Sequence, residues 1–362
     1  MDEQIDKAAQ PLIELYNKVE LDLLNKLAMN FKINEEFINS DYWRLQKLAQ
    51  LGALNEETIK YLAKVTKTSE KAIKKAIEDI GISSKHIDEF NKLYKAGKTN
   101  RNPNILKDDE VLNAIMKYSY NETLNSFITI STKIEQGVRD AYLRIVEEVW
   151  LKTTIGTVSY QEAIKEAIDE LGNSGIITLK YITQGATPKI RSYDIAGTAR
   201  REILNSLRQL NANMTMQSAV EMDWDKIYIS EHFDCRPTHF DWQGTIVNRS
   251  ELVKPPIDYG EVTGLCGINC RHYFEPYFGD AEGDDLKKIT KEEVEETYKK
   301  VTKQRYFERG IRQWKRKEEM FKVIGDEEEY KKSKKKVNWW IRRYDNYTKD
   351  NGLRRDYSRE YI

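Results

Sequence analysis

Apolar residues recur at helical spacing through most of the first hundred residues. In residues 11–31 they repeat every three or four positions, which places them on one face of a predicted helix. The same pattern predicts shorter helices over residues 41–52, 55–65 and 69–80, and Gly52 is expected to cap the first of these at its C-terminus. We therefore expect a small helical bundle at the start of the chain.

Longer helices are predicted in the next part of the chain. A polar loop containing Pro103 precedes residues 108–131 and 132–153, two segments whose apolar positions keep helical spacing. Ser159 and Glu162 form the pattern of a capping box, which predicts the N-terminus of a further helix. Helical structure is therefore expected to dominate as far as the glycines near residue 175.

The pattern then changes from helical to partly alternating. Residues 176–183, 225–230 and 244–248 are short and rich in β-branched side chains, so we expect them to be strands. Residues 194–222 lie between the first two of these segments and keep the helical pattern. This part of the chain is therefore predicted to form a small α+β domain.

Two further helices are expected after residue 287, with Gly325 between them and the second over residues 330–350. Residues 287–362 hold 24 Lys and Arg against 15 Asp and Glu, a net charge of +9, whereas the whole chain sums to zero. A basic arm on an acidic body predicts contact with phosphates or with an acidic protein. Local ion pairs on a solvated helix are the alternative explanation.

The predicted fold is mainly α with a small α+β domain. It comprises a helical N-terminal region (residues 1–100), long helices (101–175), a small α+β domain (176–286) and a basic helical C-terminal arm (287–362). No apolar run approaches the roughly 20 residues that a membrane-spanning helix needs, so no membrane segment is expected. Three cysteines in a chain of this length indicate reduced thiols rather than a disulfide framework.

Residues able to bind a metal or to act in catalysis are concentrated in one short segment. Three of the four histidines and all three cysteines lie between residues 232 and 272. We call this set the Cys/His cluster: His232, Cys235, His239, Cys266, Cys270 and His272.

The Cys/His cluster admits several explanations. Four ligands drawn from all its members except His232 would complete a tetrahedral zinc ion, although the three-residue gaps between paired ligands are unusual. The cysteines are alternatively small buried groups and the histidines hydrogen-bonded core residues, or two cysteines form a disulfide. A metal-dependent nuclease using His232, His239 and His272 is the enzymatic alternative. The sequence contains no phosphate-binding loop of the P-loop or dinucleotide type and no G-x-S-x-G motif.

Two larger sets of residues complete the candidate sites. The first is expected to hold the α+β domain together and comprises His232, Arg236, Trp242, Gln243, Gly244, Asn269 and Arg271. The second offers possible phosphate contacts on the basic arm and comprises Lys331, Lys332, Lys334, Lys335, Lys336, Arg342, Arg343, Arg354 and Arg355.

The segment around the Cys/His cluster resembles the minor capsid proteins of tailed phages, which are relatives of MuF-type head morphogenesis proteins. The resemblance lies in the strings ISEHFDCRPTHFDWQG and GLCGINCRHYFEPY. Residues 41–54, 159–176, 303–316 and 352–360 extend it over most of the chain. Cys235 departs from the family pattern, which commonly has a small residue there, and this weakens a zinc site that includes Cys235.

The resemblance implies a non-enzymatic, low-copy structural component of a phage head. Such a protein contacts the portal protein and other head proteins, lies in the head interior or at the portal vertex, and is present in the host cytoplasm during assembly. Direct contact with packaged double-stranded DNA is a further expectation, and no cofactor is expected unless zinc is bound. The nuclease and a DNA-binding module acting through the C-terminal arm remain alternatives.

Overall fold

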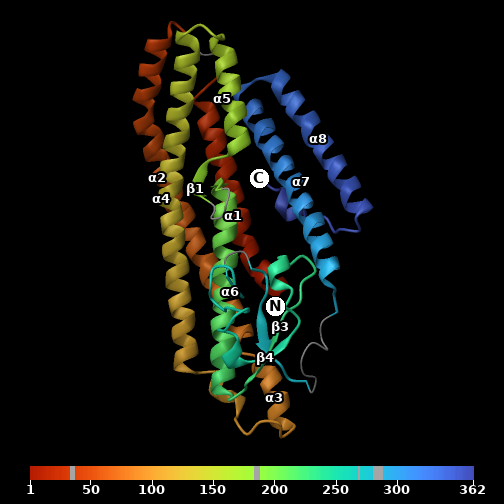
Figure 1. Ribbon diagram of the computed structural model, residues 1–362. Helices are drawn as coiled ribbons and strands as arrows, with labels where there is room; N and C mark the ends of the chain where they lie inside the picture. The colour runs from red at the N-terminus through yellow and green to blue at the C-terminus, as the bar shows by residue number, and fades with distance from the viewer. Residues whose placement is uncertain (33–36, 183–187, 268–269, 280–287) are drawn as a thin grey trace. The chain divides into compact units, whose positions relative to one another are not determined.

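The computed structural model of this protein describes residues 1–32, 37–182, 188–267, 270–279 and 288–362. It confirms a mainly α fold with a small α+β part (Figure 1). The helices are α1 (Asp2–Met29), α2 (Ser40–Ser83), α3 (Ile87–Lys95), α4 (Glu110–Thr154), α5 (Tyr160–Ser174), α6 (Ile195–Glu221), α7 (Lys291–Ile324) and α8 (Glu327–Asp350). The strands are β1 (Ile177–Ile182), β2 (Ile190–Asp194), β3 (Lys226–Ile229), β4 (Ile246–Asn248) and β5 (Phe274–Pro276).

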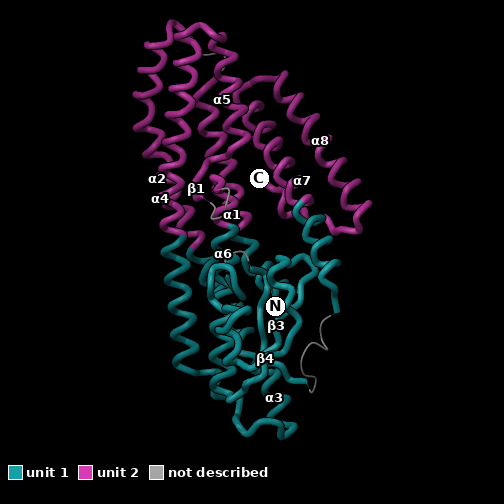
Figure 2. Tube along the Cα trace, viewed as in Figure 1, with its two compact units in different colours: residues 1–12, 70–126, 200–302 teal, residues 13–69, 127–199, 303–362 magenta. Residues whose placement is uncertain are grey.

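The chain forms two compact units, each assembled from three stretches of sequence (Figure 2). Unit 1 contains Met1–Leu12, Glu70–Ser126 and Arg200–Thr302, and unit 2 contains Ile13–Ser69, Phe127–Ala199 and Lys303–Ile362. The division into four consecutive parts made from the sequence remains a prediction.

Unit 1 is built around a three-stranded antiparallel sheet of order β4-β3-β5. Tyr228 of β3 pairs with Ile246 of β4 on one side and with Glu275 of β5 on the other. The sheet packs against α6 in a core of buried side chains. Its members include Ala212, Ala219, Ile227, Ile229, Trp242, Leu252, Leu265, Cys266, Cys270 and Phe274. Two of the six members of the Cys/His cluster, Cys266 and Cys270, therefore belong to the hydrophobic core of this unit.

Unit 2 is mainly helical and has a core rich in aromatic side chains. The Phe31 ring lies 5.0 Å from that of Tyr142, and the Trp43 ring lies 5.6 Å from that of Tyr160. The indole of Trp43 also donates a hydrogen bond to the Tyr160 hydroxyl at 3.2 Å. In the same unit β1 and β2 form a two-stranded antiparallel sheet, in which Lys180 faces Ser192.

The prediction of three short helices between residues 41 and 80 is wrong, because α2 is one continuous helix of 44 residues. Its buried positions recur mostly at intervals of three or four residues, with the partly buried Leu51 between Lys47 and Leu54, and this stripe continues beyond the polar residues that suggested turns. Thr58 and Ser69 do not break the helix, since their hydroxyls donate to the carbonyls of Leu54 and Val65 one turn earlier. Gly52 lies inside the helix and does not cap it.

The predicted boundary between residues 131 and 132 is also wrong, because α4 runs without a break from Glu110 to Thr154. The hydroxyl of Ser131 donates to the carbonyl of Phe127 at 3.1 Å, so the polar residue is satisfied within the helix. Other local predictions are confirmed: β1, β3 and β4 lie where strands were expected, and α5 begins after Ser159, whose Oγ accepts the Glu162 N–H at 3.2 Å. The sequence pattern did not reveal β2 and β5.

Candidate metal centre

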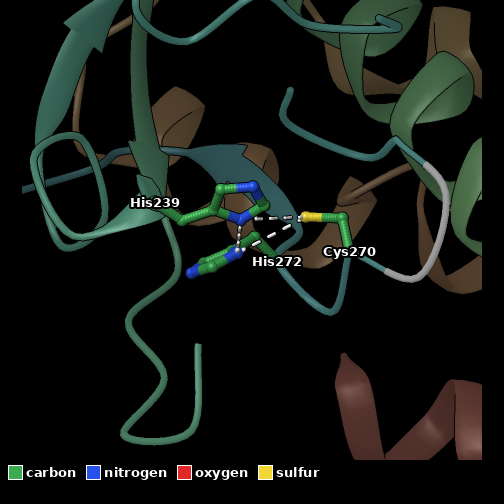
Figure 3. Close-up of side chains that lie close together, drawn as sticks. All are labelled: His239, Cys270 and His272. Atoms are coloured by element: carbon green, nitrogen blue, oxygen red, sulfur yellow. Dashed lines mark hydrogen bonds between the residues drawn. The ribbon is translucent and has the colours of Figure 1, made fainter. Parts of the chain in front are cut away.

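Three members of the Cys/His cluster converge in unit 1, and we call them the His–Cys–His triad: His239, Cys270 and His272 (Figure 3). His239 ends a single 3-10 turn, Pro237–His239, in the connection between β3 and β4. Cys270 and His272 lie in the segment that leads into β5. Because β4 and β5 both pair with β3, the sheet brings these two segments, more than thirty residues apart in sequence, to the same place.

The ligand atoms of the triad lie close together. Nδ1 of His239 is 3.4 Å from Nδ1 of His272, and the Sγ of Cys270 is 3.9 Å and 3.4 Å from these two nitrogens. All three residues are nearly inaccessible to solvent, with exposed fractions of 2%, 3% and 1% for His239, Cys270 and His272.

The outer nitrogen of each imidazole faces an oxygen that accepts hydrogen bonds. Nε2 of His239 is 2.9 Å from the Thr263 carbonyl, and Nε2 of His272 is 3.0 Å from Oε1 of Gln243. The same Oε1 accepts the backbone N–H of His232 at 2.9 Å, which fixes the orientation of the Gln243 amide. Both Nε2 atoms therefore carry the proton, and both Nδ1 atoms present a lone pair to the centre of the triad.

Burial sets the charge of these groups. It lowers the pKa of His239 and that of His272, and it raises the pKa of the Cys270 thiol. The histidines are therefore neutral at physiological pH, which is the form of imidazole that binds metals. The indole of Trp242 lies 4.6 Å from the His239 ring and 4.7 Å from the His272 ring, so it covers both imidazoles.

The other two cysteines lie outside the triad, and all three thiols are free. Cys266 is fully buried, and its Sγ lies 3.6 Å from the carbonyl oxygen of His272. Cys235 packs in a separate small apolar cluster with Ile289 and Val294. The zinc ligands considered from the sequence thus divide into three residues that converge and two that do not.

The three histidines considered for a nuclease do not form one ligand group. Nε2 of His232 lies 3.1 Å from Oγ of Ser230, and its ring meets the His272 ring edge-on at 5.0 Å. The group of potential metal ligands in the described part of the chain contains Cys270 in place of His232.

Arg271 forms ion pairs with two acidic residues of unit 1. Its guanidinium donates to Asp234 at 2.9 Å and to Asp2 at 2.8 Å. Burial by itself would raise the pKa of Asp2, but Arg271 and Arg208 hold that pKa below its ordinary value. No local pattern of residues points to Asp2, because 269 residues separate it from Arg271.

The remaining residues expected to hold the domain together have mainly backbone or packing roles. The carbonyl of Arg236 accepts the His239 N–H at 2.8 Å and so closes the 3-10 turn. Gly244 has a φ of 68°, a conformation that glycine adopts readily, and its N–H donates to the carbonyl of Ile229 at 3.0 Å. Asn269 lies outside the described residues.

The basic residues expected to contact phosphates occupy different environments in unit 2. Five lysines and two arginines are exposed on α8: Lys331, Lys332, Lys334, Lys335, Lys336, Arg342 and Arg343. Arg354 is also exposed in the segment after α8. Arg355 differs, because its guanidinium is largely buried and pairs with Asp345 and Glu360, which ties the C-terminal segment to α8.

Comparison with known proteins identifies the family. The sequence profile described as phage minor capsid protein 2 matches residues 1–348. The chain belongs to this family. A protein named "Structural protein" from Lactococcus phage LL-H is 25% identical over 299 residues, which cover 78% of each chain. No solved structure matches.

Family membership confirms the resemblance to phage minor capsid proteins. It indicates a structural component of the phage particle. Within the described ranges, no helix is both long and apolar enough to cross a membrane.

Proposed function

We propose that this protein is a low-copy structural component of the phage head, that it contacts the portal protein, and that α8 faces packaged DNA. Membership of the minor capsid family supports the place in the head. The helical architecture supports an assembly role, since long helices with exposed charged faces offer extended surfaces to neighbouring head proteins. The basic surface of α8 is the observation that supports the contact with DNA.

The two sides of α8 differ sharply. Ser333, Val337, Tyr344 and Thr348 are buried on one side at helical spacing. On the other side, a stripe of exposed residues runs through Lys332, Lys336, Trp339 and Arg343. At 1.5 Å per residue this stripe is ~16 Å long, a length over which duplex DNA carries about nine phosphate charges.

Aromatic contacts hold part of this charge at the surface. The guanidinium of Arg343 lies 4.7 Å from the centre of the Trp339 ring, and Nζ of Lys336 lies 5.5 Å from it. Local pairing offsets some of the lysines: Lys331 pairs with the exposed Glu327 at 3.1 Å, and Lys332 pairs with the partly buried Glu329 at 2.9 Å. Such pairs are weak and exchange readily for contacts with phosphates.

Equilibrium binding to duplex DNA at several salt concentrations tests the contact. Replacing Lys332, Lys336 and Arg343 with Gln is expected to weaken binding and to reduce the slope of log K against log salt by up to ~2.7, because each lost phosphate contact contributes about 0.9. The matched control replaces three exposed lysines of α2, namely Lys71, Lys74 and Lys75, and should leave the slope unchanged. Equal losses in both variants, or no binding at low salt, would reject the contact.

Asymmetric cryo-electron microscopy of intact heads tests the location. Density for this chain is expected at the portal vertex and in few copies. Co-expression with the portal protein of the same phage should give a complex that survives gel filtration. Density distributed over the whole shell, together with failure of that complex to form, would contradict the proposed position.

A further inference from the structure

We propose that the His–Cys–His triad is a zinc site, with Nδ1 of His239, Nδ1 of His272 and Sγ of Cys270 as ligands. These atoms belong to two segments that the sheet of unit 1 brings together. The proposal does not depend on contact with the portal or with DNA, since it concerns how the protein itself is held together.

The separations of the three atoms match those of ligands on a tetrahedral zinc ion. With Zn–N bonds of about 2.0–2.1 Å and Zn–S bonds of about 2.3 Å, tetrahedral angles place two nitrogens ~3.3 Å apart and a nitrogen and a sulfur ~3.6 Å apart. The corresponding separations here are 3.4 Å between the nitrogens and 3.4 and 3.9 Å from nitrogen to sulfur. An ion therefore fits if the side chains move by only a few tenths of an ångström.

The hydrogen bonds around the triad favour a cation over a direct hydrogen bond between the histidines. Because Nε2 of each imidazole donates to an oxygen, the two Nδ1 lone pairs face each other at 3.4 Å with no proton between them. A metal ion at the centre removes this repulsion. Histidine ligands in proteins typically donate their second N–H to a carbonyl or carboxyl-type oxygen, as His239 and His272 do here.

The types of ligand select the metal. A thiolate with two imidazoles suits zinc and other borderline or soft ions, whereas Mg²⁺ and Ca²⁺ prefer oxygen ligands. Binding converts the Cys270 thiol to a thiolate, and the proton leaves to solvent. The triad supplies three of the four ligands of a tetrahedral zinc ion.

The position of the site indicates a structural role for the ion. The triad is buried and Trp242 covers both imidazoles, so access for a substrate is restricted. An ion bound here would add a further link between the turn after β3 and the segment before β5, which the hydrogen bond between Gln243 and His272 and the ion pair between Arg271 and Asp234 already join. Because the site requires the folded arrangement, the binding free energy would add to the free energy of unfolding.

Metal analysis of the full-length protein, purified from cells supplied with zinc, is the direct test. We expect one zinc ion per chain and a lower melting temperature after chelation, restored by added Zn²⁺. Replacing zinc with Co²⁺ should produce the visible absorption of a tetrahedral cobalt site and a thiolate-to-cobalt charge-transfer band. Cys270→Ser should lose the ion and this band.

Cys266→Ser is the matched control, because Cys266 is an equally buried cysteine of the same segment that lies outside the triad. It should keep one zinc ion and the cobalt spectrum. The proposal is overturned if folded wild-type protein contains no zinc and takes up neither Zn²⁺ nor Co²⁺ after chelation, or if folded Cys270→Ser keeps the metal. The wild-type titration decides the matter alone if Cys270→Ser does not fold.

Discussion

Replacing Arg316 with methionine tests how strongly one buried side chain stabilises unit 2. The guanidinium of Arg316 donates to Glu20 of α1 at 3.1 Å and to Asp194 at the end of β2 at 2.8 Å. It also donates to the carbonyls of Gly172 at 3.1 Å and of Asn173 at 3.4 Å, both near the end of α5. One side chain of α7 therefore joins three other segments of the same unit.

The expected cost is about 3–5 kcal/mol, the usual penalty for removing one partner of a buried ion pair. Methionine fills a similar volume but donates no hydrogen bond, so two carboxylates and two carbonyls lose their shared donor. Burial, followed by the negative charge of Asp194, already raises the pKa of Glu20 to about 7 with Arg316 present. Adding Glu20→Gln to Arg316→Met should therefore recover part of the loss, because a neutral amide avoids the cost of protonating the Glu20 carboxylate once Arg316 is gone.

Calorimetry gives the readout. For a unit of this size each kcal/mol shifts the melting temperature by about 2–4 °C, so Arg316→Met should lower it by roughly 6–20 °C. Arg309→Met is the control, since Arg309 is exposed on the same helix and its replacement should cost no more than about 0.5 kcal/mol. A loss in Arg316→Met no larger than that of the control would show that the network contributes little net stability, and the reasoning would fail.

Three other substitutions in unit 2 have definite expected outcomes. Gly175→Ala should lower the melting temperature more than Gly156→Ala. Both glycines have positive φ, of 66° and 70°, but only at Gly175 would the new Cβ lie 2.4 Å from a Glu20 oxygen. Equal shifts of the melting temperature in the two variants would show that this clash has no effect. Because the folded-state pKa of Glu20 is raised from 4.5 to about 7, the stability that this group contributes is full below pH 4.5 and is lost as pH rises through 7. Thermal melts at about pH 5 and about pH 8 should therefore show a decline of up to ~3 kcal/mol in the wild type that Glu20→Gln lacks, and an unchanged decline in the variant would contradict this assignment. Ser159→Ala removes the N-terminal cap of α5 and should cost about 1 kcal/mol, measured by the same melts, whereas Ser159→Asp should cost almost nothing.

Much of the fold could be predicted because the signals are local. The spacing of the apolar residues predicted where helices and strands alternate. The Ser159 cap and the basic side of α8 could be predicted from neighbouring residues alone. The concentration of cysteines and histidines between residues 232 and 272 identified the place to look for chemistry, and the motifs around it identified the family.

The tertiary structure decided what local signals could not. Gly52 and Ser131 are typical of helix ends, yet α2 and α4 continue through them because a stripe of buried side chains extends along each helix and outweighs the weak local preference. β5 has only three residues and exists because it pairs with β3.

The sequence by itself determined which residues could bind a metal, and the fold determined which of them meet. The spacing of residues along the chain did not distinguish between the three cysteines as metal ligands. Pairing of β4 and β5 with the central strand β3 brings Cys270 together with His239 and His272, whereas Cys235 and Cys266 stay outside this group. The fold also determined the ion pairs of Arg316, because its partners lie far away in sequence, on α1 and at the end of β2. Distances between such side chains depend on strand pairing and helix packing, which no local pattern of residues encodes.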